Sequence, residues 1–168
     1  MLTLLTLLTV PATATPDRIA YEVELGSNAD KVVAEPEGRV AAALTGSGVA
    51  VIDGWSWQIQ NVTGACSDPR DLAAWSGDGG ETVTIWVACG DGTVVPLEVD
   101  SSREIEVGEP ITISTGYAAI GVEAGEQNGE PWLWVVTEAK SNLEVQRVAL
   151  EDYTVEGTVW TLSQSGFN

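Results

Sequence analysis

Apolar residues occur along the chain in short runs, and turns rich in glycine and polar residues separate one run from the next. Val and Thr are frequent in these runs, whereas long unbranched side chains are scarce, which favours strands and turns over helices. The 168 residues include 18 glycines and are 44% hydrophobic, enough for one domain with a substantial core. The pattern therefore predicts an all-β fold.

The same succession of runs and turns occurs three times, in copies that begin near Gly26, Gly64 and Gly116. Each copy opens with two apolar strands joined by a turn, and continues with a third strand ending in Asp and a more polar fourth strand. The expected first strands are 31–34, 71–75 and 118–123, and the expected second strands are 40–44, 83–89 and 132–137. The third strands are expected to end at Asp53, Asp100 and Asp152, and the fourth to lie near 57–63, 104–114 and 154–163.

Four antiparallel strands, of which the middle two are the most apolar, are typical of a β-propeller blade. The copies predict three blades, at 26–63, 64–115 and 116–166, after a linker and orphan outer strand at 15–25. Since closed propellers have roughly four to eight blades, the predicted fold class is a partial β-propeller of three four-stranded antiparallel blades. The rest of a longer chain, or a second copy in a homodimer, would supply the missing blades. A β-sandwich with evenly spaced hairpins is the alternative.

One stretch carries a family resemblance: PRDLAAWSGDGGETVTIWVACGDGTVVPLEVD at 69–100, followed by VGEPITIS and GYAAIGV. It resembles the YVTN-type β-propeller repeat of bacterial and archaeal surface proteins in the order of its strands and its Asp-Gly turn, and VAVID at 49–53 resembles the third-strand signature of that repeat. The likeness extends over about 26–166, but the first hairpin of the third copy is longer and the second hairpin of the first copy is very short. The resemblance implies the fold and says little about activity, because propellers host many unrelated functions.

The N-terminal run LTLLTLLTV at 2–10 is followed by Pro11 and the small residues ATAT. It has the features of a signal-peptide h-region, with Ala12-Thr13-Ala14 as the cleavage site, so we expect a signal peptide at 1–14 and a secreted, periplasmic or cell-surface protein. The basic segment that usually precedes such a run is missing, and an N-terminal strand is the alternative. Nine residues are too few to span a bilayer.

The charge of the chain is strongly negative. Seven Lys and Arg against 25 Asp and Glu give a formal charge of −18, spread along the sequence. Nucleic acid and anionic membranes need a basic surface and are therefore excluded as partners. A solvated acidic surface is the favoured interpretation, with a cationic partner, loosely held divalent ions or a salty habitat as alternatives.

Cys66 and Cys89 are the two cysteines, and their expected places at neighbouring ends of paired strands permit a disulfide. Two unrelated buried cysteines are the alternative. A zinc site is not expected, because the chain has no histidine and only two thiols.

No catalytic residues are predicted, since the chain lacks histidine, a nucleophile elbow and a phosphate-binding loop. The stretch 76–82 matches part of an Asp-box, which we interpret as a structural turn. Asp78, Glu81 and Asp91, or Glu123, Glu126 and Glu130, are weak candidates for Ca²⁺, and no other cofactor is expected. Solvated turn carboxylates are the favoured interpretation.

Seven tryptophans are present. Trp55 and Trp57 have the period-two spacing of one strand face, in a turn-rich stretch, and are the candidate ligand-binding residues for a protein, peptide or glycan. Trp75, Trp86, Trp132 and Trp134 are expected to pack between blades. The predicted function is a non-catalytic exported or surface module for binding or scaffolding. The alternative is a fragment of a lactonase-like or glycosidase-like propeller hydrolase with its site on the propeller axis.

Overall fold

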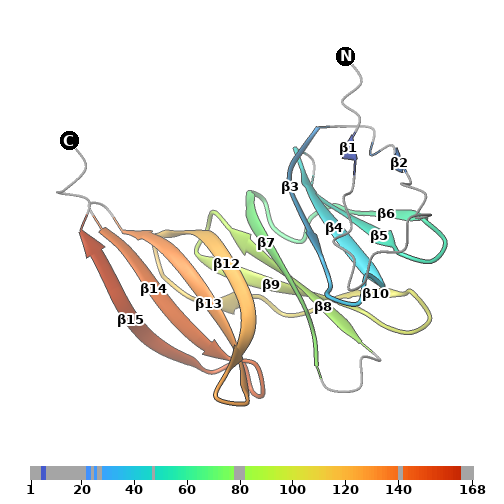
Figure 1. Cartoon of the computed structure of the whole chain (residues 1–168). Coiled ribbons are helices and arrows are strands. Elements are labelled where there is room, and N and C mark those ends of the chain that lie inside the picture. Colours follow the sequence, from blue (N-terminus) through green and yellow to red (C-terminus); the bar gives the residue numbers. More distant parts are fainter. Residues whose placement is uncertain are drawn as a thin grey trace.

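The computed structural model describes residues 5–6, 22–23, 25, 28–46, 48–77, 82–139 and 142–163. These residues form strands and loops, with no helix among them and therefore no helix able to cross a membrane. Three four-stranded antiparallel sheets lie side by side, with the first and third at opposite ends (Figure 1). The all-β prediction is confirmed. The open arrangement is consistent with a partial propeller and with the sandwich alternative.

Each sheet is a meander in which strands follow one another in sequence order. Sheet 1 contains β3 (Ala29–Ala34), β4 (Val40–Thr45), β5 (Gly48–Asp53) and β6 (Ile59–Val62). Sheet 2 contains β7 (Pro69–Ser76), β8 (Val83–Cys89), β9 (Thr93–Val99) and β10 (Ile105–Val107), and β11 (Ile111–Thr112) also pairs with β9. Sheet 3 contains β12 (Ala118–Gln127), β13 (Glu130–Ala139), β14 (Asn142–Ala149) and β15 (Val155–Ser163).

A small additional sheet pairs β1 (Leu5–Thr6) with β2 (Glu22–Val23). β1 belongs to the segment expected to be a signal peptide, whose other residues lie outside the described part of the chain. β2 belongs to the expected orphan outer strand, and its partner here is β1.

Most strands begin or end a few residues from their expected bounds, and two of the differences have a clear cause in the backbone pairing. In sheet 3 the third strand ends at Ala149 and not at Asp152, because the Ala149 N–H donates to the carbonyl of Thr154 at 2.9 Å and leaves 150–153 in the loop. In sheet 2 the fourth strand is split into β10 and β11, which pair with β9 on either side of Pro96. Since proline has no N–H, β9 cannot maintain the ladder through that position.

Two apolar cores hold the sheets together, and sheet 2 contributes to both. In sheets 1 and 2 we call the face that points toward the next sheet the forward face, and the opposite face the rear face. In sheet 3 the rear face points toward sheet 2, and the forward face points away from it. Along β8, Val87 belongs to the core that includes Leu44 of sheet 1, whereas Trp86 belongs to the core that includes Leu133 and Val148 of sheet 3. Side chains of a strand alternate between faces, so a strand covered on both sides must be apolar throughout. This explains the uninterrupted apolar run of β8.

The first strand of every sheet carries a β-bulge at the same place. The register shifts at Asp30 in β3, at Arg70 in β7 and at Ile120 in β12. A bulge adds one residue without a partner and increases the local twist of the strand. The repeated bulge shows that the three copies share a local distortion as well as strand order.

A carboxylate just after the second bulge connects all three sheets. Asp71 on β7 forms an ion pair with Lys31 on β3. Its other oxygen accepts a hydrogen bond from the backbone N–H of Val122 on β12 at 2.9 Å. The first strands of the three sheets are therefore linked through one side chain.

A second polar link joins sheets 1 and 2 at Glu35, which is 1% exposed. Its carboxylate accepts hydrogen bonds from the Arg39 guanidinium at 2.8 Å, the Arg39 N–H at 3.2 Å and the Ser76 hydroxyl at 2.9 Å. Burial favours the neutral acid, but these donors outweigh it, so the pKa of Glu35 lies below its ordinary value of 4.5. Glu35 is therefore held as a buried carboxylate.

Cys66 and Cys89 form a disulfide, with their Cα atoms 6.0 Å apart. Pro69 and Cys89 are partners in the β7–β8 ladder, which places Cys66 close to the end of β8. The bond ties the segment leading into sheet 2 to the sheet's central hairpin.

Candidate functional site

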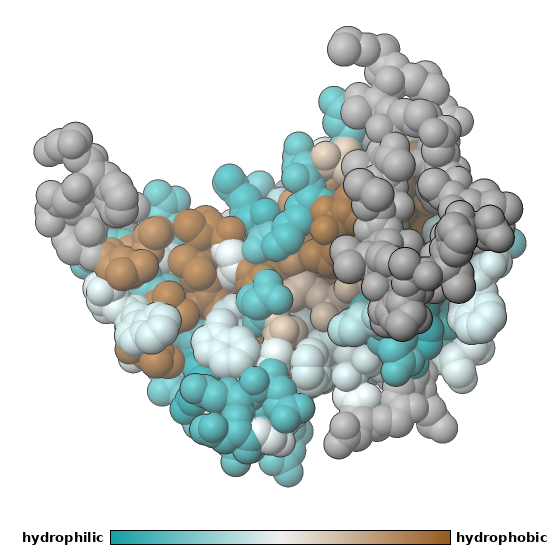
Figure 2. All heavy atoms as spheres, viewed as in Figure 1, coloured by the Kyte–Doolittle hydropathy of each residue, from teal (hydrophilic) through white to brown (hydrophobic). Residues whose placement is uncertain are grey.

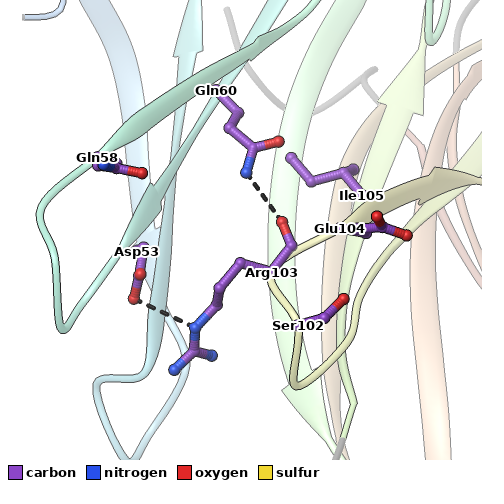
Figure 3. A pocket seen from close by; sticks show the side chains of 7 residues that line it. All are labelled: Asp53, Gln58, Gln60, Ser102, Arg103, Glu104 and Ile105. Atoms are coloured by element: carbon purple, nitrogen blue, oxygen red, sulfur yellow. Dashed lines mark hydrogen bonds and ion pairs between the residues drawn. The ribbon is translucent and has the colours of Figure 1, made fainter.

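A polar cleft of about 550 Å³ lies between the β5–β6 loop of sheet 1 and the β9–β10 loop of sheet 2 (Figure 3). Sheets 1 and 2 stack so that these two loops form its walls. The lining residues are Asp53, Gln58, Gln60, Ser102, Arg103, Glu104 and Ile105. The cleft thus presents two amides, a guanidinium, two carboxylates and a hydroxyl.

Asp53 organises the first wall. It is the last residue of β5, and its carboxylate accepts hydrogen bonds from the Trp55 N–H at 2.9 Å and the Ser56 hydroxyl at 2.7 Å. Partial burial opposes ionisation, but these donors and the Arg103 guanidinium outweigh it and hold the pKa of Asp53 below its ordinary value. Asp53 is therefore ionised at neutral pH and fixes the backbone of the loop.

Arg103 organises the second wall and bridges to the first. Its Nε lies 3.5 Å from Asp53 Oδ1, and its carbonyl accepts a hydrogen bond from Gln60 Nε2 at 2.8 Å (Figure 3). The residue has a left-handed backbone with φ 72°, which turns the chain into β10. Asp100 stabilises this turn, because its carboxylate accepts from the N–H groups of Ser102 and Glu104 at 2.9 and 3.0 Å. The cleft is thus held from both sides.

Trp55 and Trp57 lie in the β5–β6 loop beside the cleft and do not line it. The prediction that their rings share one face of a strand is wrong, because β6 begins only at Ile59. Trp57 has φ 59° and is half-buried, whereas Trp55 is 75% exposed. The Asp53 hydrogen bond to the Trp55 N–H anchors the backbone from which the Trp55 indole projects.

The tryptophans expected to pack between sheets differ in burial. Trp86 is 2% exposed and meets the Tyr153 ring edge-to-face at 5.5 Å between centroids. Trp132 is buried beneath the Arg147 guanidinium, which lies 3.9 Å from the centre of its ring. Trp75 and Trp134 are half-buried. Trp86 therefore packs between sheets 2 and 3, and Trp132 is covered from within sheet 3.

The calcium candidates that the structure describes, Asp91, Glu123, Glu126 and Glu130, form no cluster that could hold a metal ion. Asp78 and Glu81 lie outside the described part of the chain, as does the centre of the Asp-box match. Asp91 accepts hydrogen bonds from the N–H and hydroxyl of Thr93 at 3.1 and 2.7 Å, as a turn residue does. Ser76, the first residue of the Asp-box match, donates to Glu35 in sheet 1. Within the described ranges no three His, Cys, Asp or Glu side chains are placed to hold a metal ion.

Sequence reasoning missed the cleft residues Asp53, Gln60 and Arg103. One signal was available: Asp53, Asp100 and Asp152 lie at or shortly after the end of the third strand of each copy, and the carboxylate of each accepts a hydrogen bond from the N–H two residues later. These aspartates fix the loop shapes. The contact between Asp53 and Arg103 depends on how two sheets stack, which the spacing of 50 residues does not reveal.

No protein-family model and no curated protein matches this chain.

Proposed function

We propose that this protein is a non-catalytic binding module and that its ligand site is the cleft between sheets 1 and 2 together with Trp55. The observation that carries the proposal is the pairing of a highly exposed indole with an ordered polar cleft beside it. Hydrogen bonds from the Trp55 N–H and from Gln60 keep the two walls in place without a ligand. Such preorganisation lowers the entropic cost of binding.

The chemistry of the cleft favours a glycan over a charged peptide. Arg103 and Asp53 form an ion pair with each other, so their charges compensate within the site. The Gln58 and Gln60 amides and the Glu104 carboxylate, which has no cationic partner in the cleft lining, are suited to hydroxyl groups, which both donate and accept hydrogen bonds. An exposed indole adds a flat apolar surface against which a sugar ring can stack.

The stacking of the sheets favours the partial-propeller interpretation of this module. β3 contacts β7, and β7 contacts β12, so the first strands of successive sheets are neighbours. Sheet 2 is covered on both faces, whereas a two-layer sandwich has no third layer. The disulfide supports an exported or cell-surface location, since such bonds persist in oxidising compartments.

The hydrolase alternative requires carboxylates that converge near the propeller axis. Asp71 lies on the first strand of sheet 2, but its two oxygens are engaged by Lys31 and the Val122 N–H. No arrangement among the described residues favours the hydrolase, and we propose binding alone.

Calorimetric titration with a panel of neutral oligosaccharides and acidic and basic peptides tests the proposed function. Trp55→Ala should weaken glycan binding about five- to thirtyfold, the effect of about 1–2 kcal/mol expected when an aromatic contact is lost. Trp160→Ala is the matched control, because Trp160 is 69% exposed on β15 of sheet 3. Equal affinities for the two variants, or binding of peptides and no glycans, would contradict the proposal.

A further inference from the structure

The forward face of sheet 3 carries several large apolar side chains and, in the described part of the chain, has no sheet packed against it. Leu133, Val135 and Val148 point toward sheet 2. Side chains alternate between the two faces along a strand, and residues paired across strands share a face. These two rules identify the residues on the opposite face. This surface, the forward face of sheet 3, includes the apolar residues Trp134, Val136, Val145, Trp160 and Leu162, and the same pairing places the charged residues Glu123, Glu138 and Arg147 on it. Trp160 and Leu162 are 69% and 57% exposed.

The same face is covered in both preceding sheets. In each sheet, the residue that directly follows the bulge in the first strand pairs with one residue of the second strand. That second-strand residue is Leu44 in sheet 1, Ala88 in sheet 2 and Val136 in sheet 3. Leu44 is buried against sheet 2, and Ala88 is buried against sheet 3. Val136 occupies the third such position and remains half-exposed. The repeat therefore indicates that another β-sheet is the natural occupant of this face.

A second copy of the chain offers such a sheet, but its sheet 1 is not available. The rear face of sheet 1 includes Ala43, Ala50 and Ile52, all at most 1% exposed, so it has no free apolar surface on which another copy can stack. The forward face of sheet 3 on the second copy is exposed. We propose that two copies pair through the forward faces of their third sheets.

The shape of the face determines how the copies fit. Trp160 and Leu162 protrude from β15 at one edge, whereas β12 at the other edge carries Gly121 and Gly125 on either side of Glu123. A two-fold axis parallel to the strands places β15 of each copy over β12 of the other, so the protruding side chains meet the glycine-bearing edge. Figure 2 shows apolar residues gathered over the part of the surface formed by sheet 3.

The area and charge set the strength of the pairing. Four strands spaced about 4.8 Å apart, at about 3.4 Å per residue, cover about 500 Å² over the eight residues of β14. Two copies bury about 1,000 Å² in total, the lower limit for a specific interface. Each chain carries a charge of −18, so mutual repulsion opposes pairing at low salt. The dimer should therefore be weak and should be strengthened by added salt.

Sedimentation velocity of the full chain, over a concentration series at low and high salt, tests this pairing. We expect a monomer–dimer equilibrium that shifts toward dimer as salt increases. Trp160→Glu and, separately, Leu162→Gln should weaken the dimer at least tenfold. Both side chains are exposed on β15, so circular dichroism should show unchanged folding. Trp55→Glu, in the β5–β6 loop, is the control and should dimerise as the parent does.

Three results would overturn the proposal. A monomer at every concentration and salt level would exclude self-pairing and would leave the face to a sheet from the rest of a longer chain or from another polypeptide. A dimer that persists in both Trp160→Glu and Leu162→Gln would place the interface elsewhere. Larger assemblies would exclude the two-fold arrangement. None of these outcomes depends on ligand binding at Trp55, so the proposed function stands or fails separately.

Discussion

Replacing Asp71 with alanine removes a carboxylate that contacts both neighbouring sheets. The Val122 N–H, which donates to Asp71 at 2.9 Å, loses its acceptor in a partly buried position. A backbone donor left unsatisfied costs about 1–3 kcal/mol. The ion pair with Lys31, whose side chain is 35% exposed, adds about 0–1 kcal/mol. We therefore expect Asp71→Ala to lower the free energy of unfolding by about 2–3 kcal/mol.

Graded variants separate the two contributions. Lys31→Ala removes only the ion pair and should cost less than about 1 kcal/mol. Asp71→Asn keeps an oxygen that can accept from the Val122 N–H, so its cost should lie between those of Lys31→Ala and Asp71→Ala. Asp30→Ala is the matched control, since it removes the same charge from an exposed position on β3.

Urea unfolding followed by tryptophan fluorescence measures these differences. In a chain of this length, thermal unfolding should show a fall in Tm of about 2–4 °C for each kcal/mol. If Asp71→Ala and Asp30→Ala agree within about 0.5 kcal/mol, Asp71 does not link the sheets energetically. A larger effect for Lys31→Ala than for Asp71→Asn would assign the energy to the ion pair and refute the dominant role given to the Val122 hydrogen bond.

The remaining predictions concern three other buried polar residues. The pKa of Glu35 is lowered from 4.5 in the folded state, so its contribution is fully present above that pH and is lost as the pH falls through the folded-state value. The parent and Glu35→Gln should therefore differ in free energy of unfolding by about 2 kcal/mol at pH 7, and this difference should shrink in acid. Urea titrations at several pH values measure it, and a difference that does not change with pH would contradict the reasoning. Thr137 is fully buried and its hydroxyl has no hydrogen-bond partner among the described residues, so Thr137→Val should stabilise the protein by up to about 1 kcal/mol. Thr45→Val is the matched comparison, because it removes a hydroxyl that donates to a backbone carbonyl at 3.1 Å, and it should destabilise the protein by about 1 kcal/mol. Calorimetry should therefore show Tm shifts of opposite sign for the two variants, and shifts of the same sign would contradict this reasoning.

The strand pattern was largely predictable from the sequence, because alternation and turn residues are local signals. The second strand of copy two was expected at 83–89, and β8 occupies Val83–Cys89. The end of the third strand in copy three was not predictable from Asp152, because the hydrogen bond from Ala149 to Thr154 closes the loop earlier. Local composition indicates that a turn is present but does not fix which backbone groups pair across it.

The contacts between sheets were not predictable in the same way. Asp71 could be assigned to the first strand of copy two, but its partners on β3 and β12 depend on how three sheets stack. The cleft residues Asp53 and Arg103 are likewise brought together by stacking. Trp55 and Trp57 were placed correctly in a turn-rich stretch, yet the positive φ of Trp57 removes the strand geometry that their spacing suggested.

The β-bulge that the first strands share limits where residues can be inserted into the chain or deleted from it. Beyond the bulge in β7, Leu72 faces sheet 1 and Ala73 faces sheet 3. One residue inserted or deleted in this segment would exchange the two faces and turn the apolar side chains away from their cores. The hairpin loops lie outside this constraint, since five residues (35–39) join β3 to β4 and only two (128–129) join β12 to β13. Insertions for tagging or grafting therefore belong in the hairpins, where the sequence already shows that loop length varies without disturbing the stack.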